Sequence, residues 1–194
     1  MPPQTKKFET IVLSNPLVRA VWDEWERLDL PGCWLVAGCL AQTVWNKRFG
    51  FPLEHAISDL DLVYFDPDDV SAESEEQHGE RIRNMLVHLP VWIDVKNEAR
   101  VHIWYEEKFG YPIAPYSSMK DAISTFPTTA TAVGIRPSGA GAEVYAPFGL
   151  GDLLNGIVRA NQTQITREIF EAKVSKWLDR WPDLTVIPWN YSKA

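Results

Sequence analysis

The chain has 194 residues, of which 45% are hydrophobic and 23% are charged. This balance is typical of a globular protein with a substantial core, and the length suits a single domain over residues 1–194. The formal net charge is −7. It argues against long DNA or RNA as the main partner, because a protein that binds many phosphates needs a surplus of Lys and Arg.

Two further classes of protein are disfavoured by the sequence. The two cysteines, Cys33 and Cys39, lack the paired spacing of a zinc site and do not suggest a disulfide framework. The first ten residues, MPPQTKKFET, contain no apolar signal core, and no apolar run reaches membrane-spanning length. We therefore expect a cytoplasmic protein that has no membrane partner.

Helical and strand patterns alternate along the chain, which predicts an α/β (α+β) fold with a small mixed sheet packed with helices. The first helix begins at Asn15-Pro16, because Asn suits the N-cap and Pro suits the first helical position. The expected elements, in chain order, are a helix over 15–28, a strand over 33–37, a helix over 40–49, a strand over 59–65, a helix over 74–89 capped by Ser74 and Gln77, a strand over 91–95, helices over 99–108 and 119–124, strands over 130–136 and 143–146 joined by a turn at 137–141, and helices over 151–159 and 164–181.

The order of these elements predicts an α/β core followed by C-terminal helices. The core spans about residues 15–147, and the C-terminal helices over about 151–181 are expected to cap the functional site. Trp34, Trp45 and Trp92 are expected inside the protein, since large aromatic side chains dominate core packing.

Two acids separated by one residue, Asp59 and Asp61, begin the predicted strand DLDLVYF. Residues i and i+2 of a strand point to the same side, so both carboxylates project together and can clamp one hard cation. Mg²⁺ is commonly held by one or two carboxylates together with water and substrate phosphates. The alternative is a strand end at the surface that carries two solvated acids.

A third acid, Asp94, lies within the apolar strand VWIDV. A buried carboxylate is costly unless it is paired or bound to a metal. If the two acid-bearing strands are neighbours, three carboxylates come together and can hold two metal ions for phosphoryl transfer. The alternatives for Asp94 are a turn cap or an ion pair with Lys96 or Arg100.

A glycine turn precedes the acids in the sequence. Gly38 closes the strand over 33–37 and opens a helix, so the backbone can approach a phosphate closely at the positive end of the helix dipole. Cys39 is expected to be a small buried residue with no nucleophilic role. Ser58, directly before the acid pair, Lys96, on the same strand face as Asp94, and Arg136 complete the candidate nucleotide contacts. For Lys96, the alternative is a solvated side chain.

Other catalytic patterns are not supported. The four histidines, at positions 55, 78, 88 and 102, do not have the spacing of a helical zinc site. The sequence contains neither a G-x-S-x-G elbow nor a Walker phosphate loop. These absences disfavour a zinc hydrolase, a serine hydrolase and a P-loop enzyme.

The order of these motifs resembles the DNA polymerase β-like nucleotidyltransferase superfamily: a strand ending in Gly before a helix, then Asp-hydrophobic-Asp, then a lone Asp on a third strand. The segments VAGCLAQTVWN, SDLDLVYFD, WIDVKNEARVHIWY, TTATAVGIR and YAPFGLGDLLNG resemble, more narrowly, a largely uncharacterised bacterial nucleotidyltransferase-like family. This narrower resemblance covers about residues 34–155.

The resemblance implies that Asp59 and Asp61 are the paired metal-binding acids and that Asp94 is the third acid, which assists deprotonation of the acceptor. Gly38 and Cys39 would match the turn that contacts the triphosphate. The implied reaction is attack of a hydroxyl or amine on the α-phosphate of a nucleoside triphosphate, with Mg²⁺ or Mn²⁺ as cofactor. The acceptor, a small molecule or a protein, is not identified by the sequence.

Two other functions stay open at this point. A nucleotide-binding or regulatory module that has lost efficient catalysis would explain Cys39, where Ser or Gly is usual, and the insertion NKRFGFPLEHAI between Gly38 and Asp59. The presence of all three acids favours the enzyme instead. A modifier of nucleic-acid ends is disfavoured by the net charge.

Overall fold

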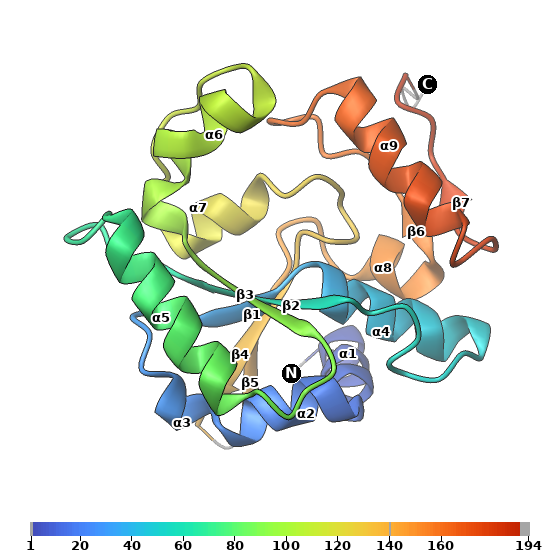
Figure 1. Ribbon diagram of the computed structural model, residues 1–194. Helices are drawn as coiled ribbons and strands as arrows, with labels where there is room; N and C mark the ends of the chain where they lie inside the picture. Colours follow the sequence, from blue (N-terminus) through green and yellow to red (C-terminus); the bar gives the residue numbers. More distant parts are fainter. Residues whose placement is uncertain (1, 140, 191–194) are drawn as a thin grey trace.

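The computed structural model describes residues 2–139 and 141–190. Its centre is a five-stranded mixed sheet in the order β3-β2-β1-β4-β5 (Figure 1). The strands are β1 (Trp34–Val36), β2 (Asp59–Tyr64), β3 (Trp92–Asn97), β4 (Gly134–Ser138) and β5 (Gly141–Tyr145). Strands β2 and β3 are parallel, and the other neighbouring pairs are antiparallel. The α/β fold and its small mixed sheet are therefore as predicted.

Helices cover both faces of this sheet. They are α1 (Pro3–Leu13), α2 (Pro16–Asp23), α3 (Trp25–Leu28), α4 (Gly38–Phe49), α5 (Ala72–Met85), a 3-10 turn (Glu98–Arg100), α6 (Val101–Phe109), α7 (Met119–Ser124), α8 (Gly151–Asn155) and α9 (Arg167–Leu178). A second, two-stranded parallel sheet joins β6 (Ile157–Val158) to β7 (Thr185–Val186). In Figure 1, α6, α7 and α9 lie above the central sheet, and α1 and α2 lie below it.

Alternation along the strands sorts their side chains into two faces. Leu60 and Leu62 of β2 are fully buried in the main core, which is completed largely by α1, α2, α4 and α5. Val63 lies on the opposite face, in a smaller cluster that includes Met119 and Ile123 of α7. The two acids of β2 share the phase of Val63, so they project toward the side of α7 and α9 and away from the main core.

The N-terminal region differs from the prediction in two ways. Asn15 caps α2 as expected, because its side chain accepts a hydrogen bond from the backbone N–H of Leu17 at 2.9 Å. The single helix expected over 15–28 is interrupted at Glu24, whose backbone (φ −97°, ψ 6°) lies outside the helical region. Helix α1 was not predicted, yet it buries Phe8 and Val12, one turn apart, in the main core.

Two helices begin at residues other than those predicted. Helix α5 begins at Ala72, because the Ser71 hydroxyl accepts the backbone N–H of Ser74, so Ser74 is the capped residue and not the cap. Helix α9 begins at Arg167, because the Thr166 hydroxyl accepts the backbone N–H of Ile169.

The C-terminal part is less helical than expected. Helix α8 ends at Asn155, because Gly156 has a left-handed backbone (φ 67°) and a Cβ there would lie 2.8 Å from the Phe49 ring. The chain then forms β6, where helix was predicted to residue 159. Strand β4 begins at Gly134 and includes Pro137 and Ser138, so it extends into the turn predicted over 137–141, of which residue 140 lies outside the described residues.

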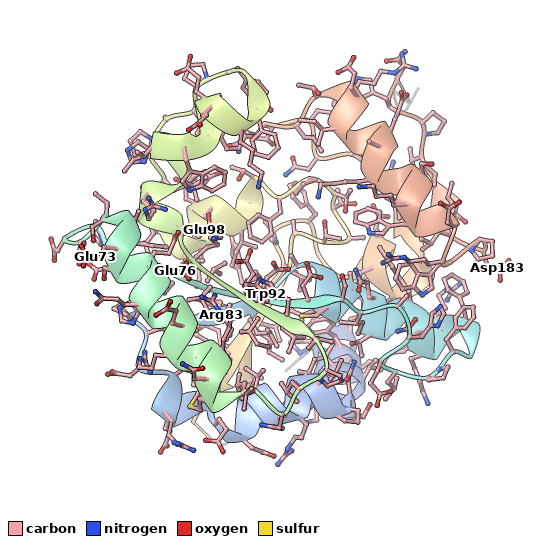
Figure 2. All side chains as sticks on the ribbon, in the orientation of Figure 1. Glu73, Glu76, Arg83, Trp92, Glu98 and Asp183 are labelled. Carbon is pink, nitrogen blue, oxygen red and sulfur yellow. The ribbon has the colours of Figure 1, made fainter. Side chains whose placement is uncertain are left out.

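Trp34 and Trp45 are buried as predicted, but Trp92 is 57% exposed. Strand β3 is an edge of the sheet, and residue 92 faces away from the main core. The Arg83 guanidinium lies 4.7 Å from the centre of the Trp92 ring and also pairs with Glu76 at 2.6 Å (Figure 2). Trp92 therefore makes a cation–π contact at the surface and does not fill the core.

Candidate active site

The three predicted acids meet on one face of the central sheet. Asp61 of β2 and Asp94 of β3 are direct partners in the parallel register, and Asp59 lies two residues before Asp61 on the same face. Apolar neighbours set this arrangement: Leu60 and Ile93 point into the main core and turn the acids to the other side.

The acids repel one another. Burial, followed by the charges of Asp59 and Asp94, raises the pKa of Asp61 from 3.8 to about 7. Two neighbours offset part of the charge: the Ser58 hydroxyl donates to Asp59 Oδ1 at 3.1 Å, and Lys96 Nζ lies 3.4 Å from Asp94 Oδ1. A cation bound beside Asp61 would therefore stabilise the charged form of this carboxylate.

The donor set fits a magnesium-type ion. Within residues 2–139 and 141–190, no group of three or more His, Cys, Asp or Glu side chains is arranged to hold a metal ion. Asp59 and Asp61 line the cavity described below, whereas Asp94 does not line it and pairs with Lys96. Two carboxylates suffice for Mg²⁺, which usually completes its octahedron with water and substrate phosphates.

The turn between β1 and α4 lies beside the acid pair. Ala37, the residue before the helix, has φ 57° and ψ −120°, a conformation that L-residues rarely adopt. A Cβ on Gly38 would lie 3.4 Å from Gln42 Nε2 and 3.7 Å from Asp61 Oδ2. Gly38 therefore brings the free N–H groups of the α4 N-terminus close to Asp61.

Cys39, the second residue of α4, lies with its side chain in the main core. The Cys39 thiol is fully buried and donates to the backbone carbonyl of Val36 at 3.6 Å. Burial raises the pKa of the thiol well above its usual value, and the negative charge of Asp61 raises it further. Cys39 therefore stays protonated. Its side chain is therefore structural, and Cys39 does not line the cavity beside the acids, which is described below.

A cavity of about 420 Å³ lies against the acids. We call it the acid cavity. Gly38, Ser58, Asp59 and Asp61 line one side of it. Lys173 and Lys176 of α9 line the other side together with Trp177 and with Arg180, which follows the end of the helix. We call these three basic side chains the cations of α9. Cations that face carboxylates across a cavity can hold an anion and a metal ion together.

One buried polar group in the acid cavity has no partner. Gln42, one turn into α4, is 7% exposed, and its Oε1 atom makes no hydrogen bond within the described part of the chain. An unpaired buried polar atom costs about 1–3 kcal/mol. The Gln42 amide lines the acid cavity beside Gly38, so a bound molecule or water there would satisfy it.

Comparisons with known proteins agree with this geometry. The sequence profile of a nucleotidyltransferase family matches residues 23–186. The chain belongs to this nucleotidyltransferase family. A solved structure described as revealing "a CCA-adding enzyme head domain" is similar, with a TM-score of 0.77 and 26% identity over 94% of this chain and 95% of that chain. A search of curated proteins returned no match. The family and the fold support a nucleotidyl transfer function.

The remaining predicted nucleotide contacts lie in different places. Ser58 lines the acid cavity. Lys96 lies between Asp94 (3.4 Å) and Glu75 (3.8 Å) and lines a second cavity. Arg136 is not brought to the acids: it pairs with Glu143 at 2.6 Å, and its guanidinium lies 4.6 Å from the centre of the Trp34 ring. Arg136 lines neither cavity.

The cations of α9 were missed by reasoning from the sequence. Lys173, Lys176 and Arg180 are spaced i, i+3 and i+7, so a basic stripe on one helical face was visible in the sequence. That stripe alone does not show which part of the protein it faces. The C-terminal helices were expected to cap the site, and α9 does line the acid cavity.

A second cavity, of about 240 Å³, adjoins Asp94. We call it the aromatic cavity, after the rings that line it: Trp104, Tyr105, Phe109, Tyr116 and Phe126. Lys173 and Pro127 line both cavities, so the two are neighbours.

Within the described ranges, no helix of the chain is long and apolar enough to cross a membrane.

Proposed function

We propose that the protein is a metal-dependent nucleotidyltransferase that moves a nucleoside monophosphate from a nucleoside triphosphate to the hydroxyl or amine of an acceptor. The observation that carries this proposal is the acid cavity, where Asp59 and Asp61 face the cations of α9. A metal–triphosphate complements this cavity, because its negative phosphates can pair with the cations and its metal ion can bind the carboxylates.

The acid cavity would bind the triphosphate end of the nucleotide. The N-terminus of α4 at Gly38 offers backbone N–H donors, and Lys173, Lys176 and Arg180 offer side-chain donors to phosphate oxygens. Asp59 and Asp61 would hold Mg²⁺ or Mn²⁺. The bound ion supplies charge neutralisation at the phosphates during transfer.

Asp94 would serve the acceptor. Its position opposite Asp61 in the register places it at the boundary between the two cavities. The acceptor oxygen or nitrogen attacks the α-phosphorus and gives its proton to the Asp94 carboxylate. The bond between the α-phosphorus and the bridging oxygen then breaks, and pyrophosphate leaves with that electron pair. Positioning and electrostatics supply the rate enhancement.

A second candidate function is favoured by one contact. Lys96 Nζ lies 3.4 Å from Asp94 Oδ1, so this ion pair would have to open before the Asp94 carboxylate could turn to an acceptor. In a nucleotide-binding or regulatory module, this pair would persist when nucleotide binds. In an enzyme, Lys96 would release Asp94 and turn to a phosphate or remain beside Glu75.

Thermal shift with each of the four nucleoside triphosphates tests nucleotide binding. We expect at least one triphosphate to raise the melting temperature by several degrees with Mg²⁺ and to have little effect with EDTA. Asp59→Ala combined with Asp61→Ala should abolish the shift. Asp183→Ala is the matched control, because this exposed acid lies away from the central sheet, at the edge of the molecule (Figure 2). A shift that ignores the metal favours the binding module.

Transfer itself is tested with α-³²P-labelled triphosphates, Mg²⁺ and a cell extract. The enzyme should transfer label in a manner that requires Asp59 and Asp61. Absence of transfer from all four nucleotides contradicts the proposed function.

A further inference from the structure

We propose that the aromatic cavity is the acceptor site and that its acceptor is a small ring-bearing molecule, not the end of an RNA. This inference rests on the proposed function, because it concerns the molecule that receives the nucleotidyl group. It goes further by naming the chemical class of that molecule.

The aromatic cavity lies on the acceptor side of the acids. Asp61 lines only the acid cavity, whereas Asp94, its register partner, lines only the aromatic cavity. A molecule in the aromatic cavity therefore lies next to the carboxylate that would take the acceptor proton. The α-phosphate of a nucleotide in the acid cavity would lie across this pair of acids. The two cavities thus offer separate places for donor and acceptor.

The walls of this cavity suit a flat ring. Five of the lining residues are aromatic, and Val101, Ile165 and Ile169 add aliphatic surface. Lys108 Nζ lies 5.2 Å from the centre of the Trp104 ring and 5.4 Å from that of Phe109, so these rings face a cation and not a packed core. Small-molecule sites are typically apolar and aromatic with a few fixed polar groups.

Hydrogen bonds hold the walls in place. The Tyr116 hydroxyl bonds to Thr125 Oγ1 at 2.9 Å and to the Gln164 side chain at 3.1 Å. The Tyr111 hydroxyl donates to the Gln164 carbonyl at 2.7 Å and meets the Tyr105 hydroxyl at 3.1 Å. These bonds tie α6 and the segment before α7 to the segment before α9. A preformed cavity lowers the entropy cost of binding a rigid ligand.

Size and charge favour a small molecule over RNA. The cavity of about 240 Å³ is smaller than the roughly 300–1,000 Å³ of sites for drug-sized ligands, so it suits one ring system and not several nucleotides. RNA binding also needs cations along the phosphate backbone. The chain has a net charge of −7, and α6, which forms one wall, exposes Glu106 and Glu107.

One polar residue inside the cavity is available to orient the acceptor. Glu98 lies at the start of the 3-10 turn before α6 (Figure 2). It is 7% exposed and lines the aromatic cavity together with Asp94 and Lys96. A buried carboxyl group next to aromatic walls can bind a polar substituent of the ring. Glu98 would therefore be a specificity residue, whose partner lies on the acceptor and not on the nucleotide.

A ring-binding probe tests the cavity without activity. We suggest titration with 8-anilinonaphthalene-1-sulfonate, which fluoresces when its rings enter an apolar site. Ile169→Trp should fill the cavity and Trp104→Ala should remove one wall, and each should weaken binding of the probe at least fivefold. The matched control is Ile103→Ala, because Ile103 neighbours Trp104 on α6, is 53% exposed and does not line the cavity. Equal binding by all three variants overturns the inference.

Label transfer separates the inference from the proposed function. The wild-type protein is incubated with an α-³²P-labelled triphosphate, Mg²⁺ and either the low-molecular-weight filtrate of a cell extract or purified total RNA. We expect label in products from the filtrate, reduced at least tenfold by Trp104→Ala and by Ile169→Trp and unchanged by Ile103→Ala. Transfer to RNA overturns the inference and leaves the proposed function intact. Transfer to neither overturns the proposed function and the inference together.

Discussion

The two cavities beside Asp61 and Asp94 share Lys173 and Pro127 but differ in the balance of charged and apolar side chains that line them. The acid cavity is lined by carboxylates, a helix N-terminus and cations, whereas the aromatic cavity is lined mainly by rings and aliphatic side chains. Lys173 belongs to both. Under the proposed function, charge would recognise the triphosphate, which is the same in every nucleoside triphosphate donor, and shape would recognise the acceptor.

The largest expected effect comes from removing one carboxylate of the acid pair. Asp61→Asn should lower the rate of label transfer by at least about 100-fold, because the metal–phosphate site loses a charged ligand. The same change should raise the stability of the metal-free protein, since it removes a carboxylate whose pKa is raised by burial. A variant that is both inactive and less stable would indicate a structural role for Asp61.

The second prediction separates the cavities through α9. Lys176→Ala and Arg180→Ala should each weaken triphosphate binding about tenfold, the scale of one lost charged hydrogen bond, and leave the ring-bearing probe unaffected. Lys173→Ala should weaken binding of both the triphosphate and the ring-bearing probe, because Lys173 lines both cavities. Calorimetric titration gives these affinities. Arg167→Ala is the control, since Arg167 is exposed, pairs with Glu171 and lines neither cavity.

The third prediction concerns pH and applies to the metal-free protein. Burial first, then neighbouring acids, raises the pKa of Asp61 to about 7 and that of Glu98 from 4.5 to about 8. The folded protein therefore retains protons that the unfolded chain has already released. The contribution of both groups to stability is complete below about pH 4 and is lost as the pH rises through the folded values.

The variant Glu98→Gln isolates the pH-dependent contribution to stability that comes from Glu98 in the aromatic cavity. The melting temperature of this variant, relative to the wild type in EDTA, should increase between pH 5 and pH 9. A constant difference across this range would show that the folded pKa of Glu98 is ordinary.

The smallest expected effect lies in the turn beside the acid cavity. Ala37 has a positive φ of 57°, where a side chain is strained and glycine is not. Ala37→Gly should therefore raise the free energy of unfolding by about 1 kcal/mol, the lower end of such strain costs. Urea denaturation measures the change. Destabilisation instead would indicate that the Ala37 side chain contributes packing that outweighs the strain.

Much of the acid cavity was predictable because its signals are local. The alternation of DLDLVYF fixes which side Asp59 and Asp61 share, and a glycine at the end of an apolar strand predicts the turn before α4. The parallel pairing that joins Asp94 to Asp61 was a condition of the prediction, and the register confirms the pairing. The metal-binding role of these acids stays a prediction.

The aromatic cavity was not predictable in the same way. Its rings come from α6, the segment before α7 and the residues after α7, and nothing in their spacing shows that they face one another. For Arg136, the sequence suggested a nucleotide contact that the structure does not bring to the acids. Its position at the end of a predicted strand did not show that Glu143 on the neighbouring strand pairs with it. The strands β6 and β7 have two residues each, too few for any periodic pattern.

The most direct test of the division between the cavities is a crystal structure with Mg²⁺ and the non-hydrolysable analogue of a triphosphate that stabilises the protein. We predict phosphates in the acid cavity between Gly38 and the cations of α9, a metal ion on Asp59 and Asp61, and an aromatic cavity free of the nucleotide. A triphosphate bound away from Asp59 and Asp61, or a nucleobase filling the aromatic cavity, would contradict the account.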